Sequence, residues 1–192
     1  MSKITAISGR VLYNSRGSKT IEVDVTTDGK YQGRVCAPSG ASVGKFEAVS
    51  FPNNSPEESL SLLNQNSDKF IGIDSSDLKQ VHDVIHSIDE TDNYAKIGGA
   101  CAFAITIAAT ESAAKVENKQ FFQMISGKSD LKFPFPLGNI LGGGAHAGPG
   151  TPDIQEILVA SIGAKTVRES IDTNLQVHKE LKKLILKNDP TF

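Results

Sequence analysis

Hydrophobic and polar residues alternate strictly near the start of the chain. Ile21, Val23 and Val25 are separated by Glu22 and Asp24, which is the two-residue period of a strand with one buried face. Residues 3–13 are also rich in Ile, Val and Thr, and Asp28-Gly29 has the composition of a tight hairpin turn. The pattern predicts three antiparallel strands in sequence order, a meander, over residues 3–13, 20–27 and 30–37.

A helical pattern replaces this alternation from Ser55 onward. The segment Ser55-Pro56-Glu57-Glu58 offers an N-cap, a proline at the first helical position and acidic residues in the first turn. Residues 76–87 carry apolar side chains at helical spacing. Residues 119–125 predict a short helix that ends at Ser126-Gly127.

Residues 99–116 are rich in alanine and apolar on most faces. Small side chains let helices approach closely, so we expect this helix at the centre of a helical bundle, with Cys101 packed in the core. Together with the strands, these helices predict an α+β domain.

A second unit is predicted after the linker-like residues 128–130. Residues 137–141 predict one strand, and residues 154–162 predict another of continuous apolar character, as is typical of strands covered on both faces. Residues 166–187 predict a long amphipathic helix with basic residues near its C-terminal end. We place the domain boundary between residues 132 and 133, which gives domains 1–132 and 133–192.

The composition is that of a soluble globular protein: 39% of the 192 residues are hydrophobic and 22% are charged. Lys and Arg number 20 against 22 Asp and Glu. The chain therefore lacks the net positive charge that would indicate a nucleic acid or an anionic membrane as partner. The most apolar run, residues 100–109, is about half the length that spans a bilayer. The only two cysteines, Cys36 and Cys101, form no C-x-x-C pattern, so we expect a cytoplasmic protein without a disulfide framework or a zinc site.

Residues 37–45, Ala-Pro-Ser-Gly-Ala-Ser-Val-Gly-Lys, are small and follow directly after a predicted strand. Such residues form ordinary connecting loops. The alternative is a mobile flap whose hydroxyls and backbone carbonyls reach a metal ion or a phosphate. Composition alone favours the connecting loop.

Residues 142–150 hold a glycine run with His146 in its middle. Glycine allows close approach of the backbone to a ligand, and an imidazole suits an anionic substrate. The run lacks the Lys-Ser/Thr ending of a P-loop and does not open directly into a helix. A lone histidine in a loop is nevertheless more often structural than catalytic.

The segment Asp153-Ile154-Gln155-Glu156 places polar residues at the entry of an apolar strand. Alternation would put Asp153 and Gln155 on one side and Ile154 and Glu156 on the other. A carboxylate there needs a partner, a metal ion or water. A solvated strand end explains the segment equally well.

Taken in order, the segments resemble the N-terminal half of the enolase family. The resemblance rests on Asn14-Ser15-Arg16-Gly17, Pro38-Ser39-Gly40-Ala41-Ser42-x-Gly44, Gly143-Gly144-Ala145-His146-Ala147 and Asp153-Ile154-Gln155-Glu156. Lys96-Ile97-Gly98-Gly99-Ala100 and Val177-His178-Lys179 extend it over essentially the whole chain, and the glycine-rich wording is similar to archaeal members. The resemblance implies an N-terminal α+β domain followed by the first strand, strand and helix of a TIM-like α/β barrel.

Enolases interconvert 2-phosphoglycerate and phosphoenolpyruvate, and the family uses two Mg²⁺ ions to stabilise the charge that develops. By resemblance, His146 and Glu156 are the catalytic candidates. His146, Gln155, Glu156 and Ser42 would bind substrate, Ser39 would reach the second Mg²⁺ ion, and Arg16 would lie at the interface of a dimer or larger homo-oligomer.

The resemblance also indicates which active-site residues of the family this sequence does not contain. The family's base lysine, its main acid glutamate and the three carboxylates of its tight Mg²⁺ site belong to later barrel strands and have no counterpart in this sequence. Two strands and one helix cannot close a barrel. We therefore expect a truncated barrel, exposed strand edges and no activity from this chain alone.

Two other functions remain open from the sequence. One is a non-catalytic, enolase-like module that binds or scaffolds a partner. The other is a phosphate- or nucleotide-binding module built on the triple glycine, which the missing P-loop ending disfavours.

Overall fold

The computed structural model describes residues 2–40, 43–128, 130–144 and 147–189. The chain divides into two compact units, Met1–Ser129 and Asp130–Phe192, and each is described by itself. The predicted domain boundary between residues 132 and 133 stays a prediction.

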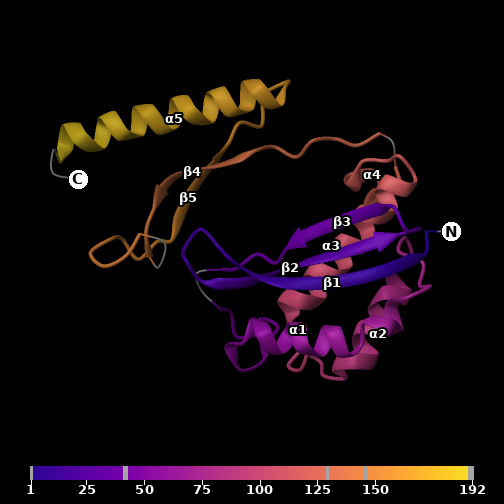
Figure 1. Cartoon of the computed structure of the whole chain (residues 1–192). Helices are drawn as coiled ribbons and strands as arrows, with labels where there is room; N and C mark the ends of the chain where they lie inside the picture. Colours follow the sequence, from indigo (N-terminus) through magenta and orange to yellow (C-terminus); the bar gives the residue numbers. More distant parts are fainter. Residues whose placement is uncertain (1, 41–42, 129, 145–146, 190–192) are drawn as a thin grey trace. The chain divides into compact units, whose positions relative to one another are not determined.

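The first unit contains the predicted meander (Figure 1). Strands β1 (Ile4–Tyr13), β2 (Lys19–Thr27) and β3 (Tyr31–Cys36) pair antiparallel in the order β1-β2-β3. The β2–β3 turn is formed by Asp28 at φ 51° and Gly29 at φ 69°. These left-handed conformations explain why Asp-Gly is favoured there.

All four helices predicted for the first unit are present: α1 (Pro56–Gln65), α2 (Leu78–Asp89), α3 (Gly99–Val116) and α4 (Phe121–Ser126). The 3-10 helices η1 (Pro52–Asn54) and η2 (Ser67–Phe70) flank α1. The Ser55 hydroxyl accepts the N–H of Glu58 at 3.2 Å, which confirms the predicted N-cap. Helix α2 begins two residues later than predicted because Asp77 caps it, accepting the N–H groups of Lys79 and Gln80.

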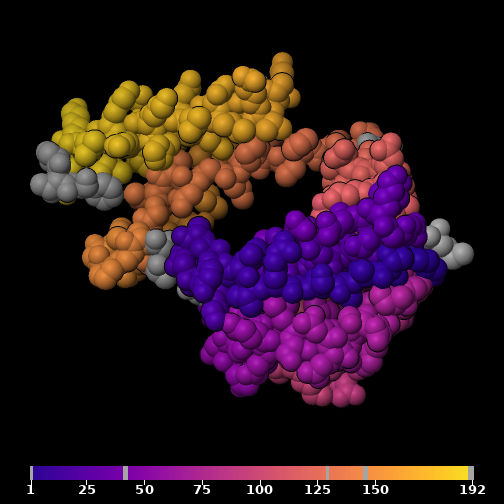
Figure 2. Space-filling model, viewed as in Figure 1, coloured from indigo at the N-terminus to yellow at the C-terminus, as the bar shows by residue number. Residues whose placement is uncertain are grey.

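Helix α3 packs chiefly on strands β2 and β3, so its predicted place at the centre of a helical bundle is corrected: its main partner is the sheet. The closest approach is at Gly33, where an added Cβ would lie 1.9 Å from the Ala108 carbonyl oxygen. Cys101 is fully buried, as predicted. The apolar face of β2 meets the helices with Ile21, Val23 and Val25, and Figure 2 shows the indigo strands lying directly on the magenta helical layer.

The other face of the sheet carries a charged network. Arg10 pairs with Glu22 and lies 3.1 Å from Asp24, while Arg34 lies 2.6 Å from Asp24. The hydrogen bond from Arg34, helped by Arg10 and opposed by burial, lowers the pKa of Asp24 below its ordinary value. Glu22 and Asp24 are thereby nearly buried, so β2 is covered on both faces and not half-buried as its alternation predicts.

The second unit is a hairpin with one helix. Strands β4 (Leu137–Gly142) and β5 (Glu156–Ala160) pair antiparallel, and α5 (Val167–Asn188) packs on them. The Asn174 side chain of α5 donates to the Pro136 carbonyl at 2.9 Å. The segment predicted as a strand over residues 154–162 is shorter, and it is not covered on both faces, because Ile157 and Leu158 are 42% and 46% exposed.

The helices in the described part of the chain include none that is both long and apolar enough to cross a membrane.

Candidate functional site

The predicted flap leaves β3 through a firmly held residue. The Ala37 N–H donates to the Ile21 carbonyl at 2.9 Å, and the Ala37 carbonyl accepts the Thr20 hydroxyl at 2.9 Å. Both backbone groups of Ala37 are therefore tied to β2. The segment that follows starts from a fixed point.

Ser39 and Gly40 lie directly beyond this point and contact Arg16 of the β1–β2 turn. Nη2 of Arg16 donates to the Ser39 carbonyl at 2.7 Å and to the Gly40 carbonyl at 3.1 Å, and lies 3.4 Å from the Ser39 hydroxyl. The carbonyl oxygen of Ser39 is thus occupied by a guanidinium. Ser42, the predicted substrate-binding residue of the flap, falls outside the described residues.

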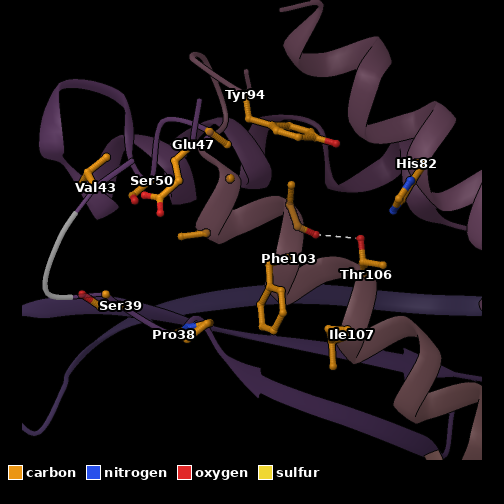
Figure 3. Close-up of a pocket in the computed structure, with 15 residues that line it drawn as sticks. Pro38, Ser39, Val43, Glu47, Ser50, His82, Tyr94, Phe103, Thr106 and Ile107 are labelled. Atoms are coloured by element: carbon orange, nitrogen blue, oxygen red, sulfur yellow. Dashed lines mark hydrogen bonds between the residues drawn. The ribbon is translucent and has the colours of Figure 1, made fainter. Parts of the chain in front are cut away.

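A cavity of about 660 Å³ opens beside Ser39 within the first unit (Figure 3). Pro38 and Ser39 border it from the flap side, His82 borders it from α2, and Phe103 and Thr106 border it from α3. The Thr106 hydroxyl donates to the Ala102 carbonyl of its own helix at 2.8 Å. The lining thus combines apolar side chains of α3, Phe103 and Ile107, with the polar side chains of Ser39 and His82.

The glycine run of the second unit is needed for backbone pairing. The N–H of Gly143 donates to the Gln155 carbonyl at 2.8 Å, and the N–H of Gly144 donates to the Pro152 carbonyl at 2.7 Å. An added Cβ at Gly143 would lie 2.3 Å from the Ile154 carbonyl oxygen. Glycine here lets two chain segments touch and fixes the approach to β5.

Gln155 and Glu156 stand at the start of β5, where Glu156 pairs in register with Gly142. Both residues are exposed. Because the strand begins only at Glu156, the alternation predicted through Asp153, Ile154 and Gln155 does not follow from strand geometry. His146, the histidine predicted to be catalytic, is outside the described residues.

Comparison with known families matches both units. Residues 4–125 match the model of the enolase N-terminal domain, and residues 130–190 match that of the enolase C-terminal TIM barrel domain. The chain belongs to the enolase family.

Similar proteins named Enolase occur in archaea. The enolase of Methanosphaera stadtmanae is 40% identical over 192 residues, and that of Methanothermobacter thermautotrophicus is 39% identical over 192 residues; each match covers 100% of this chain and 46% of the relative. The enolase of Halobacterium salinarum is 39% identical over 184 residues, covering 95% of the chain and 46% of the relative. The chain spans about half the length of the curated relatives it matches.

The predicted fold is confirmed as an enolase N-terminal domain followed by the start of the TIM barrel domain. In the described part of that second domain, a two-stranded sheet and one helix form no closed barrel.

The donor chemistry of this enolase-family chain suits a hard cation in part. Serine oxygens and a glutamate carboxylate are oxygen donors of the kind that Mg²⁺ prefers. Within residues 2–40, 43–128, 130–144 and 147–189, however, no three His, Cys, Asp or Glu side chains lie close enough together to hold a metal ion. These residues would complete a coordination shell only with further ligands.

Sequence reasoning did not single out Arg16 as a partner of the flap or His82 as a cavity residue. His82 lies on the polar face of an amphipathic helix, where the pattern marks only exposure. Asn14-Ser15-Arg16-Gly17 reads as a turn, and nothing in its composition reveals which carbonyls lie within reach of Arg16.

Proposed function

We propose that this chain forms one wall of an enolase active site, which catalyses the reversible dehydration of 2-phospho-D-glycerate to phosphoenolpyruvate. One observation carries the proposal: the segment Asp153-Ile154-Gln155-Glu156 leads into β5, with the Gln155 carbonyl bonded to Gly143 and Glu156 paired with Gly142, in a chain that is 40% identical, over its whole length, to a protein named Enolase. Homo-oligomerisation as a dimer or larger, a cytoplasmic location and inactivity of the chain alone belong to the same proposal.

The reaction requires charge stabilisation. The proton removed lies next to a carboxylate and is very weakly acidic, so the negative charge that develops must be offset. Two bound Mg²⁺ ions would supply that positive charge. Ser39 would offer its hydroxyl oxygen, which lies 3.4 Å from Nη2 of Arg16, to one of them, while its carbonyl stays hydrogen-bonded to Arg16.

The side chains of this chain would bind and orient the substrate. Glu156 would act on the departing hydroxyl, and the Gln155 amide would hydrogen-bond the substrate. His146 would lie near the phosphate, where a donor or a positive imidazole is useful, and Ser42 would contact the substrate from the flap.

The test is a chimera, in which residues 1–192 are joined to the part of the Methanosphaera stadtmanae enolase that lies beyond the matched region. We expect phosphoenolpyruvate to form from 2-phosphoglycerate in the presence of Mg²⁺, and no turnover from the 192-residue chain alone. The intact M. stadtmanae enolase is the positive control.

A chimera that folds with the circular dichroism of the control but shows no turnover would overturn the proposal and favour a non-catalytic scaffold. Binding of a nucleotide without binding of 2-phosphoglycerate, measured by calorimetry, would favour the phosphate-binding module instead.

A further inference from the structure

We infer that Arg16 is a positioning residue that fixes the Ser39–Gly40 segment at the base of the flap. Its hydrogen bonds to two successive carbonyl oxygens, at 2.7 Å and 3.1 Å, carry the inference. The value of this contact for catalysis rests on the proposed function, whereas the contact itself does not.

The β1–β2 turn is built so that it presents Arg16. Oδ1 of Asn14 accepts the N–H of Arg16 at 2.9 Å and the N–H of Ser18 at 3.0 Å. The Asn14 N–H donates to the Ser18 carbonyl at 2.9 Å, and its own carbonyl accepts the Gly17 N–H at 3.0 Å. With Gly17 at φ 73°, a conformation suited to glycine, the turn is closed from both sides and the backbone of Arg16 is held.

The segment that accepts these hydrogen bonds, residues 37–40, is also held in place. Ala37 is tied to β2 through both its backbone groups. Pro38 adds a residue with a fixed φ and no N–H to pair. Ser39 and Gly40 then turn their carbonyls toward Arg16, and a cleft of about 290 Å³ between turn and flap is lined by residues of both.

Arginine is suited to this contact. Nη2 has two N–H bonds, and the two carbonyls accept both of them, so one nitrogen bridges consecutive peptide groups. A lysine ammonium is a more strongly hydrated point charge on a shorter stem. Glutamine could donate to one of the carbonyls but has no charge, and neutral hydrogen bonds are the weaker ones.

Nuclear magnetic resonance relaxation of the 192-residue chain tests the contact. In the wild type, the amide order parameters of Ser39 and Gly40 should approach the value of about 0.85 that marks rigid backbone, and in Arg16→Gln they should fall below about 0.6. Arg16→Lys should give intermediate values. Ser15→Ala, which alters the neighbouring residue and leaves the guanidinium in place, should match the wild type.

Unchanged order parameters in Arg16→Gln, with wild-type shifts across β1, β2 and β3, would overturn the inference. So would an altered sedimentation coefficient with unchanged order parameters, because that pair of results would assign Arg16 to a subunit interface.

The chimera separates this inference from the proposed function. Since Arg16 contacts no reacting atom in the inferred role, Arg16→Gln should raise KM for 2-phosphoglycerate by roughly two- to tenfold and change kcat less. A loss confined to kcat would overturn the positioning role. An inactive parent chimera would count against the proposed function alone, because the relaxation measurement does not depend on turnover.

Discussion

The buried carboxylate of Asp89 accepts the N–H of Ile97 at 2.6 Å, and neither residue has measurable solvent exposure. The same carboxylate accepts the N–H groups of Lys96 at 2.9 Å and Thr91 at 3.0 Å. Asp89 ends α2, and Ile97 lies two residues before α3. One side chain therefore satisfies the turn between these helices and sets where α3 starts.

Replacing Asp89 with Asn should destabilise the protein by about 3 kcal/mol, because an amide group would face N–H donors that remain buried and unsatisfied. Chemical denaturation of the 192-residue chain would measure the difference. Asp83→Asn, an exposed position on the same helix paired with Lys79, is the control and should change stability by less than about 0.5 kcal/mol. Equal effects of both substitutions would contradict the role of Asp89.

The same carboxylate predicts a pH dependence. Burial alone raises the pKa of Asp89, but the hydrogen bonds from Ile97, Thr91 and Lys96 outweigh it and hold the pKa below its ordinary value. A depressed pKa stabilises the fold above the unfolded-state pKa of about 3.9, and that stability is lost as the pH falls through the lower folded-state pKa. Below about pH 4, wild type and Asp89→Asn should converge in unfolding free energy; a constant gap down to pH 2 would contradict this.

The contact of β3 with α3 gives a packing prediction. A methyl group at Gly33 would lie 1.9 Å from the Ala108 carbonyl oxygen and 2.8 Å from the Ser112 backbone nitrogen, so Gly33→Ala must push the helix from the sheet. We expect a loss of about 3 kcal/mol in unfolding free energy. Gly44→Ala, where the nearest atom lies at an ordinary 3.6 Å, should be tolerated, and a similar loss at both sites would show that the close approach is not the cause.

The two cysteines should differ in reactivity. Burial raises the pKa of the Cys101 thiol to about 12, whereas Cys36 is exposed and its thiol donates to Glu22 at 3.1 Å. A thiol reagent should label one cysteine per native chain and two in denaturant, because only the thiolate reacts. Cys36→Ser should abolish native labelling, and rapid native labelling of that variant would contradict the buried assignment of Cys101.

The sequence predicted most of this fold because its elements are marked locally. Ser55-Pro56 marks the start of α1, and Asp28-Gly29 marks the β2–β3 turn. The local sequence does not predict contacts between residues that are far apart in the chain. Glu22 and Asp24 read as exposed strand residues, yet Arg10 and Arg34 from neighbouring strands cover them. Thr27 is fully buried, and its hydroxyl is satisfied by that of Ser112 at 2.7 Å, across 85 positions of sequence.

The residue sequence of the motifs predicted the candidate site, but it did not predict the contacts within that site. The pattern marks the glycine run, but only the backbone pairing of Gly143 with Gln155 shows why a side chain is excluded there. The flap was recognisable from Pro38-Ser39-Gly40, while its attachment to Arg16 depends on how two loops 23 positions apart are folded.

The two flap serines can be separated in the chimera. If Ser39 binds the metal ion, Ser39→Ala should raise the Mg²⁺ concentration needed for half-maximal activity by roughly tenfold. Ser42→Ala should mainly raise KM for 2-phosphoglycerate. Because Arg16 holds the Ser39 carbonyl at 2.7 Å and lies 3.4 Å from the hydroxyl, the hydroxyl is the oxygen that a metal ion would bind. The opposite pattern in the two variants would transfer the metal role to Ser42.

Glu156 gives the most direct test of the chemistry. If its carboxylate acts on the departing hydroxyl, Glu156→Gln in the chimera should lower kcat by about 10²- to 10⁴-fold, the usual contribution of a positioned acid or base. KM should change little, since the amide keeps the shape of the side chain. Asp153→Asn removes a nearby exposed carboxylate to which the proposed reaction gives no role, and it should retain kcat within about twofold. A Glu156→Gln chimera that keeps its kcat would remove Glu156 from the reaction, and a matching loss in Asp153→Asn would show that the local charge, and not the one carboxylate, is what turnover requires.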